Sequence, residues 1–489
     1  MKEKLFNNLD ELLTNEIFNN FNKISQIPRP SFKEKKVSDF LKSWAESLDL
    51  EVLQDEYSNL LISKPASKGY EGKRPIILQA HTDMVCEKHP EVDHDFDKDP
   101  IDLVLDGDIL STGGRTTLGA DNGIGVAIAM TILESNSLSH PKLDVLLTVA
   151  EEEDMSGALN VEPSWFRTNR IINLDNSIDN QLITGSAGGK GVKLSVPVKH
   201  TNVDKNKYKS FDLTVKDLQG GHSGEDIDKG LANSNTLLAR LLNEIRKECE
   251  LLISQIQGGN FRLAIPREST CKINIRQNDL GKVQNIIDKL SKEFVNRYEG
   301  IEANLTVELK ESDFNEASLD LASTSKAIDT ILISPNGISE MLGGIDVVES
   351  SINLGEVYLK DNKLFFIYEI RAIYETSREY IYDKLCIISK LMNGDIEYFA
   401  KYPSWTYLPE SDLRELILEI YEKKYGEVME AIVLHAGLEC GCFASKIKDM
   451  DAVSLGPNTW NLHAPSESVS VSSTIKIYNL LVNILKELN

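Results

Sequence analysis

Histidine and acidic residues follow four apolar runs of this sequence, and their side chains are of the types that bind metal ions. Each run has the short, continuous hydrophobic pattern of a buried strand. Ligands of an open α/β sheet bind at the carboxyl ends of its strands, so side chains that follow several strands can converge on one site. The runs and the residues after them are 75–80 with His81 and Asp83, 143–150 with Glu151 and Glu152, 171–174 with Asp175, and 452–455 with His463.

Asp121, at the start of the helical segment NGIGVAIAMTIL, is a further candidate ligand. Taken alone, Asp121 could be a helix N-cap, the glutamates 151–153 a solvated loop and His81 a hydrogen-bonded core histidine. Together, imidazole and carboxylate groups without a thiolate indicate a catalytic Zn²⁺ site, with Co²⁺ or Mn²⁺ as alternatives. Five candidates exceed the three protein ligands of a typical catalytic zinc, whereas two ions about 3.5–4 Å apart with a bridging carboxylate would use all five.

The elements that position these residues predict an α/β fold. Apolar strands alternate with helical patterns at 122–133 and 474–488, which is typical of a mostly parallel central sheet covered by helices. Between them, a middle section of alternating runs and helices predicts a second, α+β domain inserted into the first. Its patterned segments are the runs 193–198, 211–216 and 364–371 and the helix 233–249.

We place the domain joints near residues 187 and 402, so that 1–187 and 403–489 form a discontinuous catalytic domain and 188–402 an inserted domain. The small-residue stretch 185–191 has neither the G-x-G-x-x-G spacing nor the G-K-[ST] ending of a phosphate-binding loop. It is interpreted as a flexible hinge between the domains.

The composition excludes several classes of function. The 489 residues include 53 Lys and Arg against 76 Asp and Glu, a net charge of −23, which argues against nucleic acid or an anionic membrane as the main partner. Six cysteines are too few for a disulfide framework. The N-terminal segment is amphipathic without the apolar core of a signal peptide, and the most apolar run, 123–133, is shorter than the roughly 20 residues that span a bilayer. We expect a soluble, cytoplasmic protein.

The candidate ligands lie in motifs that resemble those of the M20 metallopeptidases, specifically the aminoacyl-histidine dipeptidase branch (peptidase D, cytosolic Xaa-His dipeptidase). H-x-D, a distant Asp, a Glu pair and a late His are typical of the superfamily, whereas HDFxxDPI, IPRES and HAGLECG are more specific to the branch. The matching segments, in order along nearly the whole chain, are SQIPRPS (25–31), LQAHTDMVCEK (78–88), HDFDKDPI (94–101), LGADNGIGVA (118–127), AEEEDMSGA (150–158), GGHSGEDI (220–227), IPRES (265–269), PNGI (335–338), HAGLECG (435–441) and HAPSE (463–467).

The resemblance implies a role for each candidate in a centre of two zinc ions. Asp121 would bridge the ions, Asp83 would hydrogen-bond an imidazole and fix its tautomer, and Glu151 would be the general base. The three consecutive glutamates leave the register open, and alignment of the following M-S-G-A segment favours this assignment. The remaining ligands would be His81 and Asp175 on one ion, and Glu152 and His463 on the other.

In the inserted domain, the resemblance implies that His222 stabilises the tetrahedral oxyanion and that Arg371 binds the substrate carboxylate. Without it, His222 would be interpreted as an exposed turn residue and Arg371 as a surface residue of a strand. His435 and Glu439 of HAGLECG are further candidates for substrate contacts, Glu439 with the substrate amine. Leu263 stands where relatives usually carry Asn, which puts any substrate contact through that Asn in doubt.

The implied function is hydrolysis of unblocked dipeptides, including Xaa-His dipeptides, by a metal-bridging hydroxide. The inserted domain would close over a small substrate as a lid and could form a homodimer. Two alternatives remain open: an N-acyl amino acid deacylase with the same machinery, and a catalytically dead metal-binding protein. His222 could act in its own subunit or across a dimer.

Overall fold

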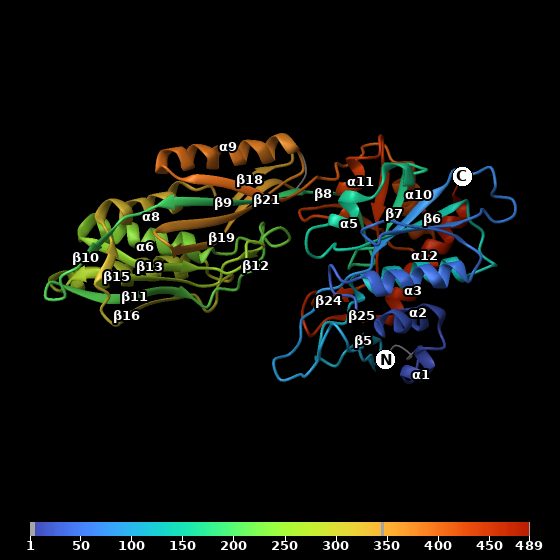
Figure 1. Ribbon diagram of the computed structural model, residues 1–489, viewed down its shortest axis with the longest axis horizontal. Helices are drawn as coiled ribbons and strands as arrows, with labels where there is room; N and C mark the ends of the chain where they lie inside the picture. The colour runs from blue at the N-terminus through green and yellow to red at the C-terminus, as the bar shows by residue number, and fades with distance from the viewer. Residues whose placement is uncertain (1–4, 344–346, 489) are drawn as a thin grey trace. The chain divides into compact units, whose positions relative to one another are not determined.

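The computed structural model describes residues 5–343 and 347–488 (Figure 1). Unit 1 contains the described residues up to Ser186, then Trp405–Leu434 and the described residues from Leu438 onward. Unit 2 contains Ala187–Ser404 and His435–Gly437. Each unit has its own buried hydrophobic cluster. The assignment of these units as a catalytic domain and a lid stays a prediction.

An eight-stranded sheet forms the centre of unit 1, in the order β1-β2-β6-β3-β7-β23-β8-β22. The neighbours of β3, which are β6 and β7, both run parallel to it, and β23 runs parallel to β7. The carboxyl ends of these four strands therefore meet at one edge of the sheet. The strands are β1 (Glu51–Gln54), β2 (Leu60–Lys64), β3 (Ile76–His81), β6 (Leu143–Thr148), β7 (Arg170–Asn173), β8 (Gln181–Ser186), β22 (Glu430–Leu434) and β23 (Asp451–Ser454).

Helices cover this sheet, and every residue of β3, β6, β7 and β23 is buried, as expected for parallel strands packed on both faces. The central helix α4 is apolar on all sides and packs against β3, α2 and α12. The predicted α/β fold is confirmed. The helices are α1 (Leu9–Leu12), α2 (Glu16–Ser25), α3 (Lys35–Glu46), α4 (Ala120–Glu134), α5 (Ser156–Asn160), η1 (Pro163–Trp165), α10 (Asp412–Tyr425), α11 (Glu439–Ala444) and α12 (Val471–Glu487).

A four-stranded sheet in unit 1 holds the late histidine segment. Its order is β24-β25-β5-β4, and the loop between β24 and β25 carries His463. The strands are β4 (Val104–Asp106), β5 (Ile109–Ser111), β24 (Thr459–Trp460) and β25 (Ser468–Ser470).

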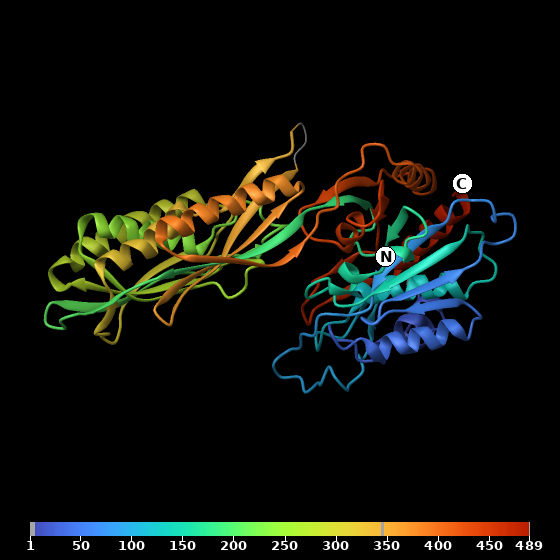
Figure 2. The ribbon, with the colours of Figure 1, turned by 45° about the horizontal axis from the view of Figure 1, so that its top comes forward.

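Unit 2 is built on an antiparallel sheet in the order β16-β11-β15-β13-β19-β20-β9-β21, with β18 paired to β19. Figure 2 shows its helices along one face of the sheet, the arrangement of an α+β domain. The helices are α6 (Ser234–Glu248), η2 (Gln277–Asp279), α7 (Leu280–Arg297), α8 (Leu321–Ile333) and α9 (Glu375–Met392). The strands are β9 (Gly188–Pro197), β11 (Tyr208–Lys216), β13 (Leu251–Gly258), β15 (Ser269–Arg276), β16 (Thr306–Glu311), β18 (Gly337–Met341), β19 (Val348–Lys360), β20 (Lys363–Ala372) and β21 (Asp395–Tyr402), with the short pairs β10 (His200–Asn202) to β17 (Ala317–Leu319) and β12 (Gly221–His222) to β14 (Ala264–Ile265).

The stretch 185–191 has extended strand structure and contains the boundary between the two units, and its role as a flexible hinge stays a prediction. It is the end of β8, Ala187 and the first residues of β9, all buried. A Cβ atom at Gly189 would lie 2.2 Å from the Tyr402 ring, and one at Gly191 would lie 2.8 Å from the Phe399 ring. The glycines therefore allow two aromatic rings of β21 to lie flat against β9. Within the described residues, no helix is both long and apolar enough to cross a membrane.

Candidate metal centre

Histidine and acidic side chains from five elements lie together in unit 1. They come from the ends of β3, β6 and β7, from the start of α4 and from the β24–β25 loop. Three groups of residues each place one ligand atom per residue within 4.8 Å of the others. The residues predicted as metal ligands are thus brought together. The groups are His81 with Asp121 and Asp175, His81 with Glu151 and Glu152, and Asp121 with Glu152 and His463.

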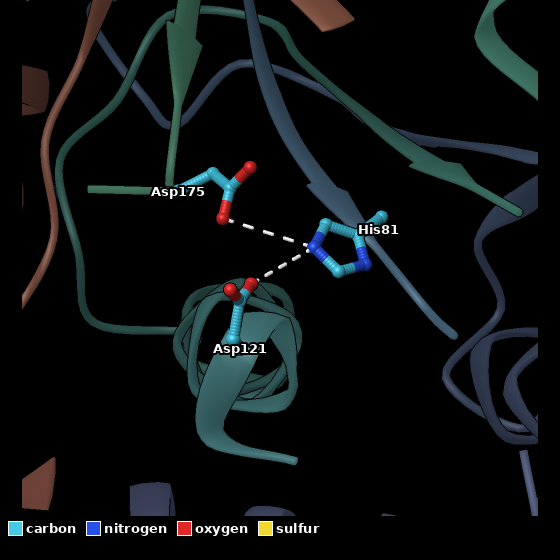
Figure 3. A group of neighbouring side chains, drawn as sticks. All are labelled: His81, Asp121 and Asp175. Atoms are coloured by element: carbon cyan, nitrogen blue, oxygen red, sulfur yellow. Dashed lines mark hydrogen bonds and ion pairs between the residues drawn. The ribbon is translucent and has the colours of Figure 1, made fainter. Parts of the chain in front are cut away.

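The two oxygens of Asp121 face different histidines. Oδ1 lies 3.0 Å from His81 Nε2, which also lies 3.8 Å from Asp175 Oδ1 (Figure 3). Oδ2 lies 3.5 Å from His463 Nε2, which lies 2.9 Å from Glu152 Oε2. One carboxylate between two sets of ligands is the arrangement that a bridge between two cations requires.

The turn after β6 separates the three consecutive glutamates. Ala150 has a left-handed backbone conformation (φ 54°), and residues 151–154 form the turn. Glu151 Oε2 lies 4.0 Å from His81 Nε2, Glu152 reaches His463, and Glu153 is exposed. Neighbouring glutamates can therefore do different chemistry, one beside the metal ligands and one among them.

Asp83 connects β3 to this turn. Its Oδ1 lies 3.3 Å from His81 Nδ1 and accepts a hydrogen bond from the Glu151 amide at 3.1 Å. Its Oδ2 accepts from the Glu152 amide at 3.2 Å and from the Ser31 hydroxyl at 2.8 Å. A carboxylate at Nδ1 favours the tautomer that leaves Nε2 free to bind a cation.

Glu467 holds the start of α4. This buried carboxylate accepts hydrogen bonds from four successive backbone amides, those of residues 118–121, at 2.8, 2.9, 2.8 and 3.2 Å. Asp121 is the last of the four, and its peptide bond to Asn122 is cis. Glu467 was noted in the sequence only as part of HAPSE, without this role.

Arg29 and Glu34 support the same region, and neither was singled out in the sequence analysis. The buried Arg29 guanidinium donates to the carbonyl oxygens of Thr82 and Asp83 at 3.0 and 2.9 Å, and to that of Gly119 at 2.6 Å. Glu34 accepts from the Ala150 amide at 2.8 Å. The one available signal was the position of Arg29 inside the SQIPRPS motif.

The buried charges of this cluster shift the pKa values of its members. Burial lowers the pKa of His463, but its hydrogen bonds to two carboxylates, first that of Asp121, raise it to about 11. Burial likewise opposes the charge on His81, and its acidic neighbours, Asp175 foremost, raise its pKa well above the usual range. Burial raises the pKa of Glu151 and of Asp175 well above their usual ranges, and neighbouring carboxylates add to the rise.

The residues present fit divalent cations. The donor set contains imidazole nitrogens and carboxylate oxygens and no sulfur, which suits Zn²⁺, Co²⁺ or Mn²⁺. Among the described residues, the buried Oε1 of Glu152 has no hydrogen-bond partner. A buried carboxylate oxygen of this kind is stabilised by a bound cation. The cluster is therefore a candidate metal centre.

His222 and Arg371, two other predicted site residues, belong to unit 2, where the structure brings them together. Arg371, at the end of β20, is 2% exposed, so it is no surface residue. It donates through Nη1 to the Tyr402 hydroxyl at 2.7 Å, and its Nη2 lies 3.3 Å from His222 Nε2. His222 Nδ1 accepts from the Glu225 amide at 3.2 Å. The sequence had not indicated Tyr402.

Two further residues of unit 2 lie near this pair. The Nε2 atom of the buried His435 lies 2.7 Å from the Ser351 hydroxyl. Burial and the nearby Arg371 lower the pKa of His435 to about 3, so its side chain is neutral at pH 7. Leu263 is half-buried, and its carbonyl accepts from the Ser223 amide, beside His222, at 2.8 Å. An apolar side chain thus stands at this position of the inserted domain.

Comparison with known proteins agrees with the fold. A family model described as "Peptidase dimerisation domain" matches residues 207–302, within unit 2. The cytosol non-specific dipeptidase of Escherichia coli (strain K12) is 34% identical over 483 residues, which cover 98% of this chain and 99% of that protein. The crystal structure of aminoacylhistidine dipeptidase from Vibrio alginolyticus superposes with a TM-score of 0.85 at 31% identity, covering 98% of both chains. The crystal structure of aminopeptidase PepT from Bacillus cereus shares the fold. It superposes with a TM-score of 0.56 at 16% identity, covering 97% of this chain and 98% of that one.

The fold and the site define a metallopeptidase-type enzyme with a second domain inserted into its α/β domain. The chain belongs to the M20 peptidase family. The resemblance drawn from the sequence motifs is confirmed.

Proposed function

We propose that this protein is a metal-dependent dipeptidase that hydrolyses unblocked dipeptides, including those that end in histidine. The observation that carries the proposal is the convergence of two ligand groups on the two oxygens of Asp121, with Glu151 beside them. Full-length similarity to the E. coli dipeptidase and to the V. alginolyticus aminoacylhistidine dipeptidase supports the substrate class.

The centre would hold two Zn²⁺ ions, one at His81 and Asp175 and the other at Glu152 and His463, with Asp121 common to both. Co²⁺ or Mn²⁺ could replace zinc because the donor set suits all three. When bound, the ions lower the pKa of water and polarise a substrate carbonyl. Asp83 keeps the His81 imidazole in the tautomer that presents Nε2.

Glu151 is proposed as the general base. Its carboxylate lies at the rim of the cluster, 4.0 Å from His81 Nε2, and its backbone amide is fixed by Asp83. Its carboxylate would take the proton of the attacking water and then deliver that proton to the nitrogen of the leaving amine. Asp83 thus holds the backbone from which this proton carrier extends.

Arg371 and His222 are proposed to bind the substrate through unit 2. Arg371 would pair with the free carboxylate of a dipeptide, and among the described residues its buried Nε has no hydrogen-bond partner. His222, next to it, would donate to the carbonyl oxygen as negative charge develops there. Because the matched family model describes a dimerisation domain, we also propose a homodimer formed through unit 2.

The test is steady-state hydrolysis of β-Ala-His, Gly-His, Ala-Leu, an N-acetyl amino acid and a tripeptide, with Zn²⁺ and with a chelator. Metal-dependent cleavage of the free dipeptides alone supports the proposal. Cleavage of the acetylated substrate alone would assign the protein to the deacylases. No metal-dependent turnover of any substrate would refute an enzymatic role.

A further inference from the structure

A buried polar cluster lies in unit 1 at the ends of the three strands that present the proposed ligands. Gln79 of β3 donates through Nε2 to Thr148 Oγ1 of β6 at 3.0 Å and accepts from Asn173 of β7 at 2.6 Å. The same Nε2 donates to Glu439 Oε2 of α11 at 2.5 Å, and the Thr148 hydroxyl donates to that oxygen at 2.8 Å. One carboxylate oxygen therefore connects two strands directly and a third through Gln79.

The strand register relates this cluster to the ligands. Gln79 and Asn173 are partners across β3 and β7, and each lies two residues before a proposed ligand, His81 or Asp175. Gln79 and His81 both belong to β3, and residues two apart in a strand point to the same face of the sheet. A shift in the Gln79 side chain would therefore alter the packing beside His81 on that face.

Glu439 is placed for support and not for contact with a substrate. Its side chain is 0% exposed, and among the described residues its Oε1 has no hydrogen-bond partner. This burial differs from the expectation that Glu439 binds the substrate amine. The nearby carboxylates of Glu151 and Asp175 interact electrostatically with it. Burying an acid beside other acids costs stability, and an apolar residue of similar size would avoid this cost.

We propose that Glu439 is a positioning residue of the metal centre: through Gln79 and Thr148 it fixes the ends of β3, β6 and β7 and so sets the spacing of His81, Glu152 and Asp175. This inference rests on the proposed function, since it presupposes that these residues bind metal. Supporting side chains behind metal ligands characteristically alter metal affinity by about 10–100-fold when replaced.

The test measures Co²⁺ binding to the full-length, metal-stripped protein by calorimetry and by the visible absorption of the bound ion. Glu439→Leu removes both hydrogen bonds at nearly constant volume, whereas Glu439→Gln keeps an oxygen that can accept both. Thr148→Val removes one donor without touching Glu439 and serves if the Leu variant does not fold. Asp144→Asn is the matched control, because Asp144 is also fully buried but lies near the start of β6, bonded to Ser63.

We expect Glu439→Leu to weaken Co²⁺ binding by about 10–100-fold and to change the absorption bands, with a smaller effect in the same direction for Thr148→Val. Glu439→Gln should restore most of the affinity, and the control should bind Co²⁺ as the wild type does. Unchanged affinity and spectrum in the Leu and Val variants would overturn the inference. Failure of the wild type itself to bind Co²⁺ would instead refute the proposed function.

Discussion

Replacing Glu467 by Gln tests whether the carboxylate that accepts four amides holds Asp121 in place. Oε2 accepts from the amides of Leu118 and Gly119, and Oε1 from those of Ala120 and Asp121. In the Gln side chain one of these oxygens becomes an NH₂ group, which is itself a donor. In either orientation two buried amides lose their acceptor.

The expected loss of stability follows from those two amides. Each buried donor without an acceptor costs about 1–3 kcal/mol, so the variant should lose about 4 kcal/mol. For a unit of this size, such a loss lowers Tm by roughly 7 °C. Because Asp121 belongs to both ligand groups, Co²⁺ affinity should fall in the same variant.

Tryptophan fluorescence is the appropriate assay because the four tryptophans, at 44, 165, 405 and 460, all belong to unit 1. The melting of unit 1 can thus be followed without a signal of this kind from unit 2. Glu46→Gln, the same substitution at an exposed position of α3, is the control and should melt as the wild type does. A Glu467→Gln variant that melts within about 2 °C of the wild type would refute the reasoning. A lower Tm with unchanged Co²⁺ affinity would show that Glu467 stabilises the fold without positioning Asp121.

Three further predictions concern single side chains. Glu151→Gln should lower kcat by about 10²–10⁴-fold while Co²⁺ affinity stays near that of the wild type; a variant that keeps its kcat would exclude Glu151 as the base. Arg371→Lys should raise KM for free dipeptides about tenfold or more and have little effect on C-terminally amidated ones, and an equal effect on both would argue against carboxylate binding. The pKa of His435, about 3, lies below the pKa of 6.5 of a histidine in the unfolded chain. Between these two pH values the unfolded chain binds more protons than the folded one, so the free energy of unfolding decreases as the pH falls through 6.5. Between pH 7 and pH 5 the wild type should therefore lose about 2 kcal/mol more than His435→Gln in urea unfolding followed by circular dichroism, and equal losses would contradict this.

The convergence of the candidate ligands could be predicted from the sequence because it depends on local patterns. Continuous apolar runs mark the buried parallel strands, and the polar residue after each run must lie at the same edge of the sheet as the others. β3 and β7 lie within one residue of the runs 75–80 and 171–174. His81 and Asp175 thus follow from strand positions alone.

Asp83 was predicted as a support of the imidazole, and it does lie beside His81. The other supports of the ligands could not be predicted, because their partners are set by the tertiary fold. Glu467 binds the amide of Asp121 across 346 residues of sequence, and Arg29 binds backbone carbonyls, which no side-chain pattern marks. Arg371 is a similar case. An arginine at the end of a strand is usually exposed, but here the strand lies inside a wide sheet, and Tyr402 of β21 receives its hydrogen bond.

Charge balance gives an independent argument for two cations over one. When ionised, Asp121, Glu151, Glu152 and Asp175 carry four negative charges at one edge of the sheet, and the two histidines are neutral when they act as ligands. One divalent cation would leave two of these charges uncompensated. Burial already raises the pKa of three of the four carboxyl groups, those of Glu151, Glu152 and Asp175. Two divalent cations balance the four. Asp83 and Glu467, behind the cluster, need no further cation, because backbone amides donate to both carboxylates and both lie near the Arg29 guanidinium.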